Sequence, residues 1–182
     1  MILFIDTHDE LITIALKNNN QIYIKTKLSE YAHSVYTMPL IEEIFKENNL
    51  DIKDLKKIIV VNGPGSFTGI RIGLSIAKTI AYALKISINP ISSLTAYLVS
   101  HETTEDKKAV IEDNKGYYVS VFDKNNNVIV EETYVEEDTY NFKKVENKLD
   151  VEKIINYCEN IESENPHFIK ANYIKKIEVE KW

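Results

Sequence analysis

The sequence of 182 residues has a single cysteine and no long hydrophobic run, and both scarcities exclude classes of protein. Cys158 alone excludes an internal disulfide and any zinc site built on cysteines, so we predict that it is a packing residue. No apolar run is long enough to cross a membrane, and we expect no membrane association. Met1 leads directly into the apolar residues 2–5 without the charged region or cleavage site of a signal peptide, so we expect a cytoplasmic protein.

Carboxylates are missing from one long stretch. The net charge of −6 argues against a chain that binds a polyanion unaided, because nucleic-acid affinity depends largely on neutralised phosphates. Residues 55–101 nevertheless contain no Asp or Glu. Their five cations are Lys56, Lys57, Arg71, Lys78 and Lys85. Either this is the buried half of the molecule, where carboxylates are unfavourable, or it is a face suited to an acidic partner; so few cations favour the buried half.

Four of the five glycines and the only arginine lie within residues 62–78. This stretch follows the β-branched residues 58–61 and leads into the apolar segment 70–84, so the pattern predicts a strand, a tight turn and a helix. Such a turn lets the backbone come close to another group. The residues expected to serve this structural turn are Gly63, Gly65, Ser66, Thr68 and Arg71.

Known glycine motifs do not fit this turn. A phosphate-binding P-loop needs Gly-Lys-Ser/Thr, which is absent. A dinucleotide site needs an acidic residue about 20 positions further on, and none occurs before Glu102. A nucleophile elbow needs Gly-x-Ser-x-Gly, whereas Ser66 directly follows Gly65. A turn that simply lets a helix start against a sheet remains the plain alternative.

The predicted helix carries two apolar stripes at four-residue spacing. A helix that is apolar on most of its circumference is buried on more than one side, so one side is expected to pack on the sheet and the other on a partner subunit. The stripe of small residues is expected to let another helix approach closely. The small residues are Gly69, Gly73, Ala77 and Ala81, and the larger ones are Ile72, Ile76, Ile80 and Leu84.

Alternating apolar residues and turn signals predict the remaining elements. Ser29 is a plausible N-cap for a helix to about residue 48, with a kink or break near Thr37 because Pro39 lies inside it. Ser92 is expected to cap a helix through about residue 100. The predicted strands are residues 2–5, 11–16, 21–25, 86–91, two within 109–122, and 128–134, with a further helix near 151–157.

The turn at residues 6–10 holds three carboxylates and no glycine, so it should repel phosphate. Asp6, His8 and Glu10 alternate and could share one strand face as metal ligands, but exposed turn residues are the favoured interpretation. His33 is expected to be a hydrogen-bonded structural residue. The four histidines form no His-x-x-x-His pair, which argues against a metallopeptidase.

Several segments of the first hundred residues resemble the TsaB (YeaZ) family. They are residues 61–74, the start Ile5-Asp6-Thr7, His33-Ser34 with Met38-Pro39, and Ile91-Ser92-Ser93-Leu94. The resemblance implies an α/β protein with the actin-like ATPase (ASKHA) fold and two related lobes, residues 1–104 and an abbreviated second lobe, 105–182. The closing stretch 172–176 is also similar to the family. Glu112-Asp113-Asn114 stands where the family usually has Asp-Ala-Arg.

The resemblance also implies a function, that of a non-catalytic partner and activator of TsaD in the tRNA threonylcarbamoyladenosine modification complex. It implies contact with TsaE through the TsaB–TsaD pair and with tRNA only within the complex, and leaves open a homodimer of the chain alone. ATP and metal are expected in the partner subunits and no cofactor in this one, since Ser93 and Tyr97 occupy the positions of the two metal-binding histidines of TsaD. The interface residues it implies are His33, Tyr36, Gly69, Ile72, Gly73, Ile76, Ala77, Lys78, Ile80 and Ala81. The alternative is a nucleotide-binding or nucleotide-hydrolysing ASKHA enzyme.

Overall fold

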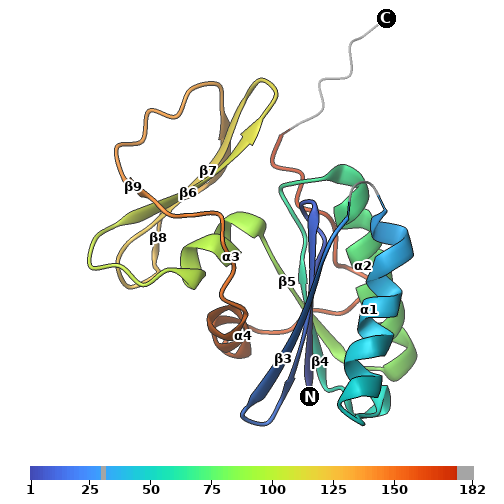
Figure 1. Ribbon diagram of the computed structural model, residues 1–182. Coiled ribbons are helices and arrows are strands. Elements are labelled where there is room, and N and C mark those ends of the chain that lie inside the picture. The colour runs from blue at the N-terminus through green and yellow to red at the C-terminus, as the bar shows by residue number, and fades with distance from the viewer. Residues whose placement is uncertain (30–31, 176–182) are drawn as a thin grey trace, which may run out of the picture.

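The computed structural model describes residues 1–29 and 32–175, which form two sheets with helices around and between them (Figure 1). The first sheet has the order β3-β2-β1-β4-β5, with β1 to β3 antiparallel and β4 and β5 parallel to β1. Its strands are β1 (Ile2–Asp6), β2 (Leu11–Asn18), β3 (Gln21–Leu28), β4 (Lys57–Val61) and β5 (Ser87–Ile91). All five strands were predicted, and most of the predicted ranges are one to three residues shorter than the observed strands.

The second sheet repeats the first in reduced form. Its order is β8-β7-β6-β9, and β9 runs parallel to β6 as β4 runs parallel to β1. Within the described residues, the second sheet has no strand in the place of β5, and no helix lies between β8 and β9 as α1 lies between β3 and β4. The strands are β6 (Lys107–Asp113), β7 (Gly116–Phe122), β8 (Val128–Val135) and β9 (Lys143–Lys144). The predicted α/β class, with two related lobes and the second one abbreviated, is confirmed.

Helices cover both faces of the first sheet. On one face, α1 (His33–Glu47) and α2 (Phe67–Leu84) enclose Leu3 and Ile5 of β1. On the other face, α3 (Ser93–Ser100) and α4 (Val151–Glu159) enclose Phe4 of β1. Because both faces are covered, the central strands β1 and β4 are apolar without alternation, as in parallel sheets, whereas the edge strand β3 is largely exposed. A short 3-10 helix, Ile52–Asp54, precedes β4. None of the described helices combines the length and the hydrophobicity that a membrane crossing requires.

The start of α1 and the effect of its proline differ from the prediction. The N-cap is Ala32 rather than Ser29, whose hydroxyl accepts a hydrogen bond from the Ala32 N–H at 3.1 Å. The helix continues without a break through Pro39. The carbonyl that loses its partner to this proline belongs to Val35, which is 60% exposed, so water can satisfy it. The Ser92 cap of α3 is confirmed by its hydrogen bond from the Thr95 N–H at 3.0 Å.

Residues 161–175, here called the C-terminal strap, return to the first lobe after α4 (Figure 1). Glu164 pairs with Ile88 of β5, and the Asn172 N–H donates to the Asn62 carbonyl at 2.8 Å. At its end, Lys175 donates to Asp113 of the second lobe at 2.9 Å. The strap thus contacts both lobes, and the boundary at residues 104/105 stays a prediction. Lys176, the last residue of the predicted closing stretch, lies outside the described residues.

Candidate functional site

The glycine-rich turn packs against the turn between β1 and β2. Ser66 caps α2 by accepting a hydrogen bond from the Gly69 N–H at 3.2 Å. The Ser66 N–H in turn donates to the carbonyl of His8 at 2.6 Å, and the Thr7 hydroxyl donates to the carbonyl of Gly69 at 2.8 Å. The group that this turn approaches is therefore the chain's own backbone.

Side chains have no room at the contact between these two turns. A Cβ on Gly69 would lie within 3.0 Å of the Thr7 carbonyl oxygen, and one on Gly65 within 3.0 Å of the His8 carbonyl oxygen. Gly65 also has a φ of +154°, which side-chain-bearing residues rarely adopt. A Cβ on Gly63 would clash only with the end of the Ile70 side chain, but the φ of +106° at Gly63 also favours glycine. Thr68 and Arg71 are exposed on α2.

The stripe of small residues on α2 faces the protein's own sheet, which corrects the prediction that it faces a partner helix. Gly69 and Gly73 lie against Thr7 at the end of β1, and Ala77 and Ala81 are fully buried in the core beneath the helix. Ile80 is also buried. A small-residue stripe lets either a helix or a sheet come close, so the spacing alone could not distinguish the two.

The predicted interface residues that remain on the surface are the larger ones. Ile72 and Ile76 of α2 are half-buried, as is Tyr36 on the neighbouring helix α1. Val35 of α1 is exposed. We call these four residues the helix face. His33 is buried and hydrogen-bonded through Nε2 to the carbonyl of Asp9 at 2.6 Å, and Lys78 donates to the carbonyl of Ile169 at 2.9 Å.

A cleft of about 490 Å³ lies between the lobes. The β1–β2 turn lines one side with Asp9 and Glu10, and the β6–β7 hairpin lines the other with Glu112 and Asp113. Asp113 is paired with Lys175 at 2.9 Å, and the other carboxylates of the lining still make this cleft acidic.

Asp6, His8 and Tyr97 form a buried hydrogen-bonded chain behind the cleft. His8 Nδ1 lies 2.7 Å from Asp6 Oδ1, and His8 Nε2 lies 2.7 Å from the Tyr97 hydroxyl. The expectation of an exposed turn is therefore wrong for Asp6 and His8, which are 1% and 3% exposed, although Asp9 and Glu10 are exposed. The sequence carried no signal for Tyr97 as the partner, because it lies 89 residues away on α3.

The environment shifts the pKa of two residues in this hydrogen-bonded series, His8 and Tyr97. Burial lowers the pKa of His8, but the charges of Asp6 and Asp9 and the hydrogen bond to Asp6 outweigh it, so the pKa is raised above 6.5. Burial, with the charges of Asp9 and Asp6, raises the pKa of Tyr97. Tyr97 therefore stays a neutral hydroxyl, and the proton on His8 is stabilised.

The other nucleophilic and metal-binding side chains are engaged elsewhere or dispersed. Within residues 1–29 and 32–175, no three His, Cys, Asp or Glu side chains converge as a metal site would require. The Ser93 hydroxyl donates to the carbonyl of Pro64 in the glycine-rich turn. Cys158 is buried in the core, and burial raises the pKa of its thiol to about 12, so its prediction as a packing residue is confirmed.

Comparison with known proteins identifies the family. The family model of TsaD, tRNA N6-adenosine threonylcarbamoyltransferase, matches residues 19–175. The chain belongs to this family. Within it, the chain groups with proteins named tRNA threonylcarbamoyladenosine biosynthesis protein TsaB, which confirms the resemblance to TsaB (YeaZ).

The relatives differ in how much of their length is matched. TsaB of Bacillus subtilis is 40% identical over 99 residues, 51% of this chain and 41% of the relative. TsaB of Buchnera aphidicola from Acyrthosiphon pisum is 28% identical over 190 residues, 96% of this chain and 82% of the relative. The crystal structure of YeaZ from Pseudomonas aeruginosa superposes with a TM-score of 0.83 at 15% identity, over 94% of this chain and 98% of that one. The actin-like ATPase (ASKHA) fold is thereby confirmed.

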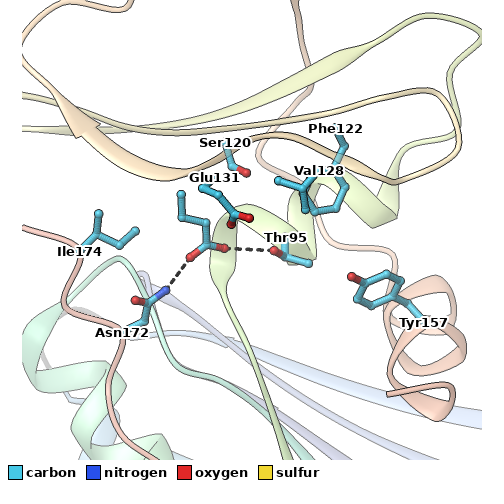
Figure 2. A pocket seen from close by; sticks show the side chains of 9 residues that line it. Thr95, Ser120, Phe122, Val128, Glu131, Tyr157, Asn172 and Ile174 are labelled. Atoms are coloured by element: carbon cyan, nitrogen blue, oxygen red, sulfur yellow. Dashed lines mark hydrogen bonds between the residues drawn. The ribbon is translucent and has the colours of Figure 1, made fainter. Parts of the chain in front are cut away.

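A second cavity of this TsaB-family chain, about 420 Å³, lies where the strap passes between the lobes (Figure 2). The carboxylate of Glu132 on β8 accepts hydrogen bonds from the Thr95 hydroxyl at 3.0 Å and the Asn172 amide at 2.6 Å, and a third from the Ser92 hydroxyl. Glu132 thus joins α3, β8 and the strap. Sequence reasoning missed this junction because its members are spread over 80 positions, from Ser92 to Asn172.

Proposed function

We propose that this chain is a non-catalytic partner and activator of a TsaD-type transferase in tRNA threonylcarbamoyladenosine biosynthesis, and that it docks through the helix face. The helix face carries this proposal because it consists of apolar side chains left at the surface of two helices whose other sides are already used by the sheet. Apolar surface of this kind marks protein–protein contact sites. Relatives named for threonylcarbamoyladenosine biosynthesis, and the match to the transferase family itself, support the pathway.

Two positions that bind the metal in a TsaD-type transferase have a structural role in this chain. Ser93 and Tyr97, at the positions of the metal-binding histidines of TsaD, hold the glycine-rich turn and His8. In this proposal the transferase supplies the metal, ATP belongs to partner subunits, and the pair acts with TsaE and tRNA. The chain contributes a docking surface that keeps the transferase competent.

A charge introduced on the helix face tests the docking. Ile72→Glu is expected to abolish the mixed species that light scattering detects between this chain and TsaD of the same organism, because a carboxylate buried at an apolar interface costs several kcal/mol. Ile72 is only partly exposed, so a melting curve of the free variant shows whether its fold is intact. Ile129→Glu, the same change at an exposed isoleucine of β8, is the matched control and should pair normally.

Two results would contradict the proposal. One is the absence of any mixed species with the unaltered chain, and the other is normal pairing of folded Ile72→Glu. A homodimer of the chain alone that also disappears in Ile72→Glu would place self-association and docking on the same face.

The cleft should not take a nucleotide. Calorimetric titration with ATP and Mg²⁺ is expected to show no saturable heat, because Asp9, Glu10 and Glu112 repel the phosphates. Micromolar binding would instead favour the nucleotide-dependent enzyme as the function. Calcium ions titrated in place of ATP control for cation binding by the same carboxylates.

A further inference from the structure

Arg71, the only arginine, stacks on the ring of Phe67 and lies beside Tyr173, at the edge where the strap meets α2. Its guanidinium carbon lies 3.6 Å from the ring centre of Phe67 and 5.9 Å from that of Tyr173. Its Nε donates to the Tyr173 hydroxyl at 2.9 Å. Phe67 and Tyr173 remain 51% and 50% exposed, so this cluster is ordered but open to solvent. The guanidinium is therefore fixed in orientation before anything binds it.

The unused donors of this guanidinium point to a carboxylate. Nε is occupied by Tyr173, which leaves the two terminal nitrogens, the pair that binds a carboxylate in bidentate fashion. No ion pair of Arg71 occurs within residues 1–29 and 32–175. Acidic residues are absent from both segments that build this edge, residues 55–101 and residues 165–175.

The structure confirms that most of the carboxylate-free segment is buried, but it leaves three of its cations exposed. Residues 55–101 were expected to be the buried half, in which acids are simply unfavourable. Lys56, Arg71 and Lys85 are exposed, so the segment presents positive charge to solvent in a chain whose net charge is −6. Arg71 lies on the side of α2 that faces the strap, next in sequence to Ile72 of the helix face but turned to a different side of the helix.

We infer that Arg71 is a docking residue that receives a carboxylate from an acidic segment of the transferase seated on the helix face. This inference rests on the proposed function and specifies the partner chemistry of the same site. Arginine and aromatic residues are enriched among those that carry most of the binding energy at protein interfaces. Because stacking on Phe67 and the bond to Tyr173 already restrict the side chain, binding loses less conformational entropy than it would with a free lysine.

The observations favour a protein carboxylate over an RNA phosphate. Affinity for RNA grows with the number of neutralised phosphates, and this edge has one arginine. Lys78, the neighbouring cation on α2, is engaged with the carbonyl of Ile169. One well-oriented guanidinium suits a single bidentate contact rather than a tract of phosphates.

The test compares Arg71→Met with the unaltered chain in calorimetric titrations against TsaD of the same organism. Methionine keeps an unbranched apolar side chain at this position and removes the charge. We expect about a tenfold loss of affinity at about 50 mM salt and a smaller loss at about 300 mM salt, where screening weakens the contact. Arg71→Lys should recover only part of the loss, because lysine cannot make the bidentate contact. Lys56→Met removes an exposed charge at the start of β4 and should bind normally.

The outcomes separate this inference from the proposed function. If the unaltered chain binds the transferase and Arg71→Met binds equally well, the inference is wrong and the docking proposal stands. If the unaltered chain does not bind the transferase, the docking proposal itself is wrong, and the inference that rests on it is wrong as well. If Arg71→Met weakens binding to free tRNA and leaves transferase binding unchanged, the inference is overturned in favour of an RNA phosphate. Melting curves of each variant, expected to match the unaltered chain, show that the fold is intact.

Discussion

Replacing Gly69 by alanine is expected to lower the free energy of unfolding by about 1–3 kcal/mol, the usual range for overpacking a close contact. Within a helix, glycine to alanine normally stabilises by up to about 1 kcal/mol, so the expected sign is reversed. The reason is that the added methyl group would lie within 3.0 Å of the Thr7 carbonyl oxygen, and backbone cannot rotate away as a flexible side chain can. Urea denaturation of the two proteins measures the difference.

Thr68→Ala is the matched control for this substitution. Thr68 is in the same first turn of α2 and is exposed, so its replacement should change the stability by no more than about 0.5 kcal/mol. A neutral or stabilising Gly69→Ala would mean that the β1–β2 turn can yield to the helix. The close contact that defines the glycine-rich turn would then not be essential.

The fold followed from local patterns wherever a segment was strongly apolar or strongly marked by turn residues. The strand, turn and helix around residues 57–84 were predicted on this basis, as was the Ser92 cap. The orientation of α2 was not, because Gly69 and Gly73 fit equally well against a helix or a sheet. That choice depends on which layer lies beneath the helix, and this is tertiary information.

The candidate site was predicted only in part for a related reason. Tyr36, Ile72 and Ile76 remain on the surface as expected, whereas Asp6 and His8 were assigned to an exposed turn. A carboxylate and a histidine two residues apart look like solvated turn residues when no partner is visible. Their burial depends on Tyr97 and on the charge pairing between them, which no pattern within a short window contains.

The strap shows the same limit at the other end of the chain. Residues 161–175 are polar and weakly patterned, so nothing in their periodicity predicted that they return to the first lobe. Their position is set by single contacts with distant groups, such as Asn172 with Asn62 and Glu132, and Tyr173 with Arg71. These contacts make the strap part of the proposed docking edge.

Removing the charge of Asp6 is expected to cause the second large loss of stability. Asp6→Asn should lower the free energy of unfolding by about 3 kcal/mol at about pH 6, because it leaves a protonated His8 without its counter-ion in the core. In the unaltered protein the raised pKa of His8 means that folding stabilises its proton. This contribution is complete below pH 6.5, the ordinary histidine pKa, and is lost as the pH rises through the higher folded value.

The loss caused by Asp6→Asn should therefore shrink between about pH 6 and about pH 9, since a neutral His8 has no charge to pair. The charged and titratable groups around His8 are Asp6 on β1, Asp9 in the turn and Tyr97 on α3. Asp9→Asn is the control, because Asp9 is exposed and lies 3.8 Å from His8 Nε2, so a loss below about 1 kcal/mol is expected. Urea denaturation at both pH values measures these effects. A loss from Asp6→Asn that is equal at the two pH values would show that the hydrogen bond, rather than the charge of His8, carries the contribution, since only the charged pair changes across this range.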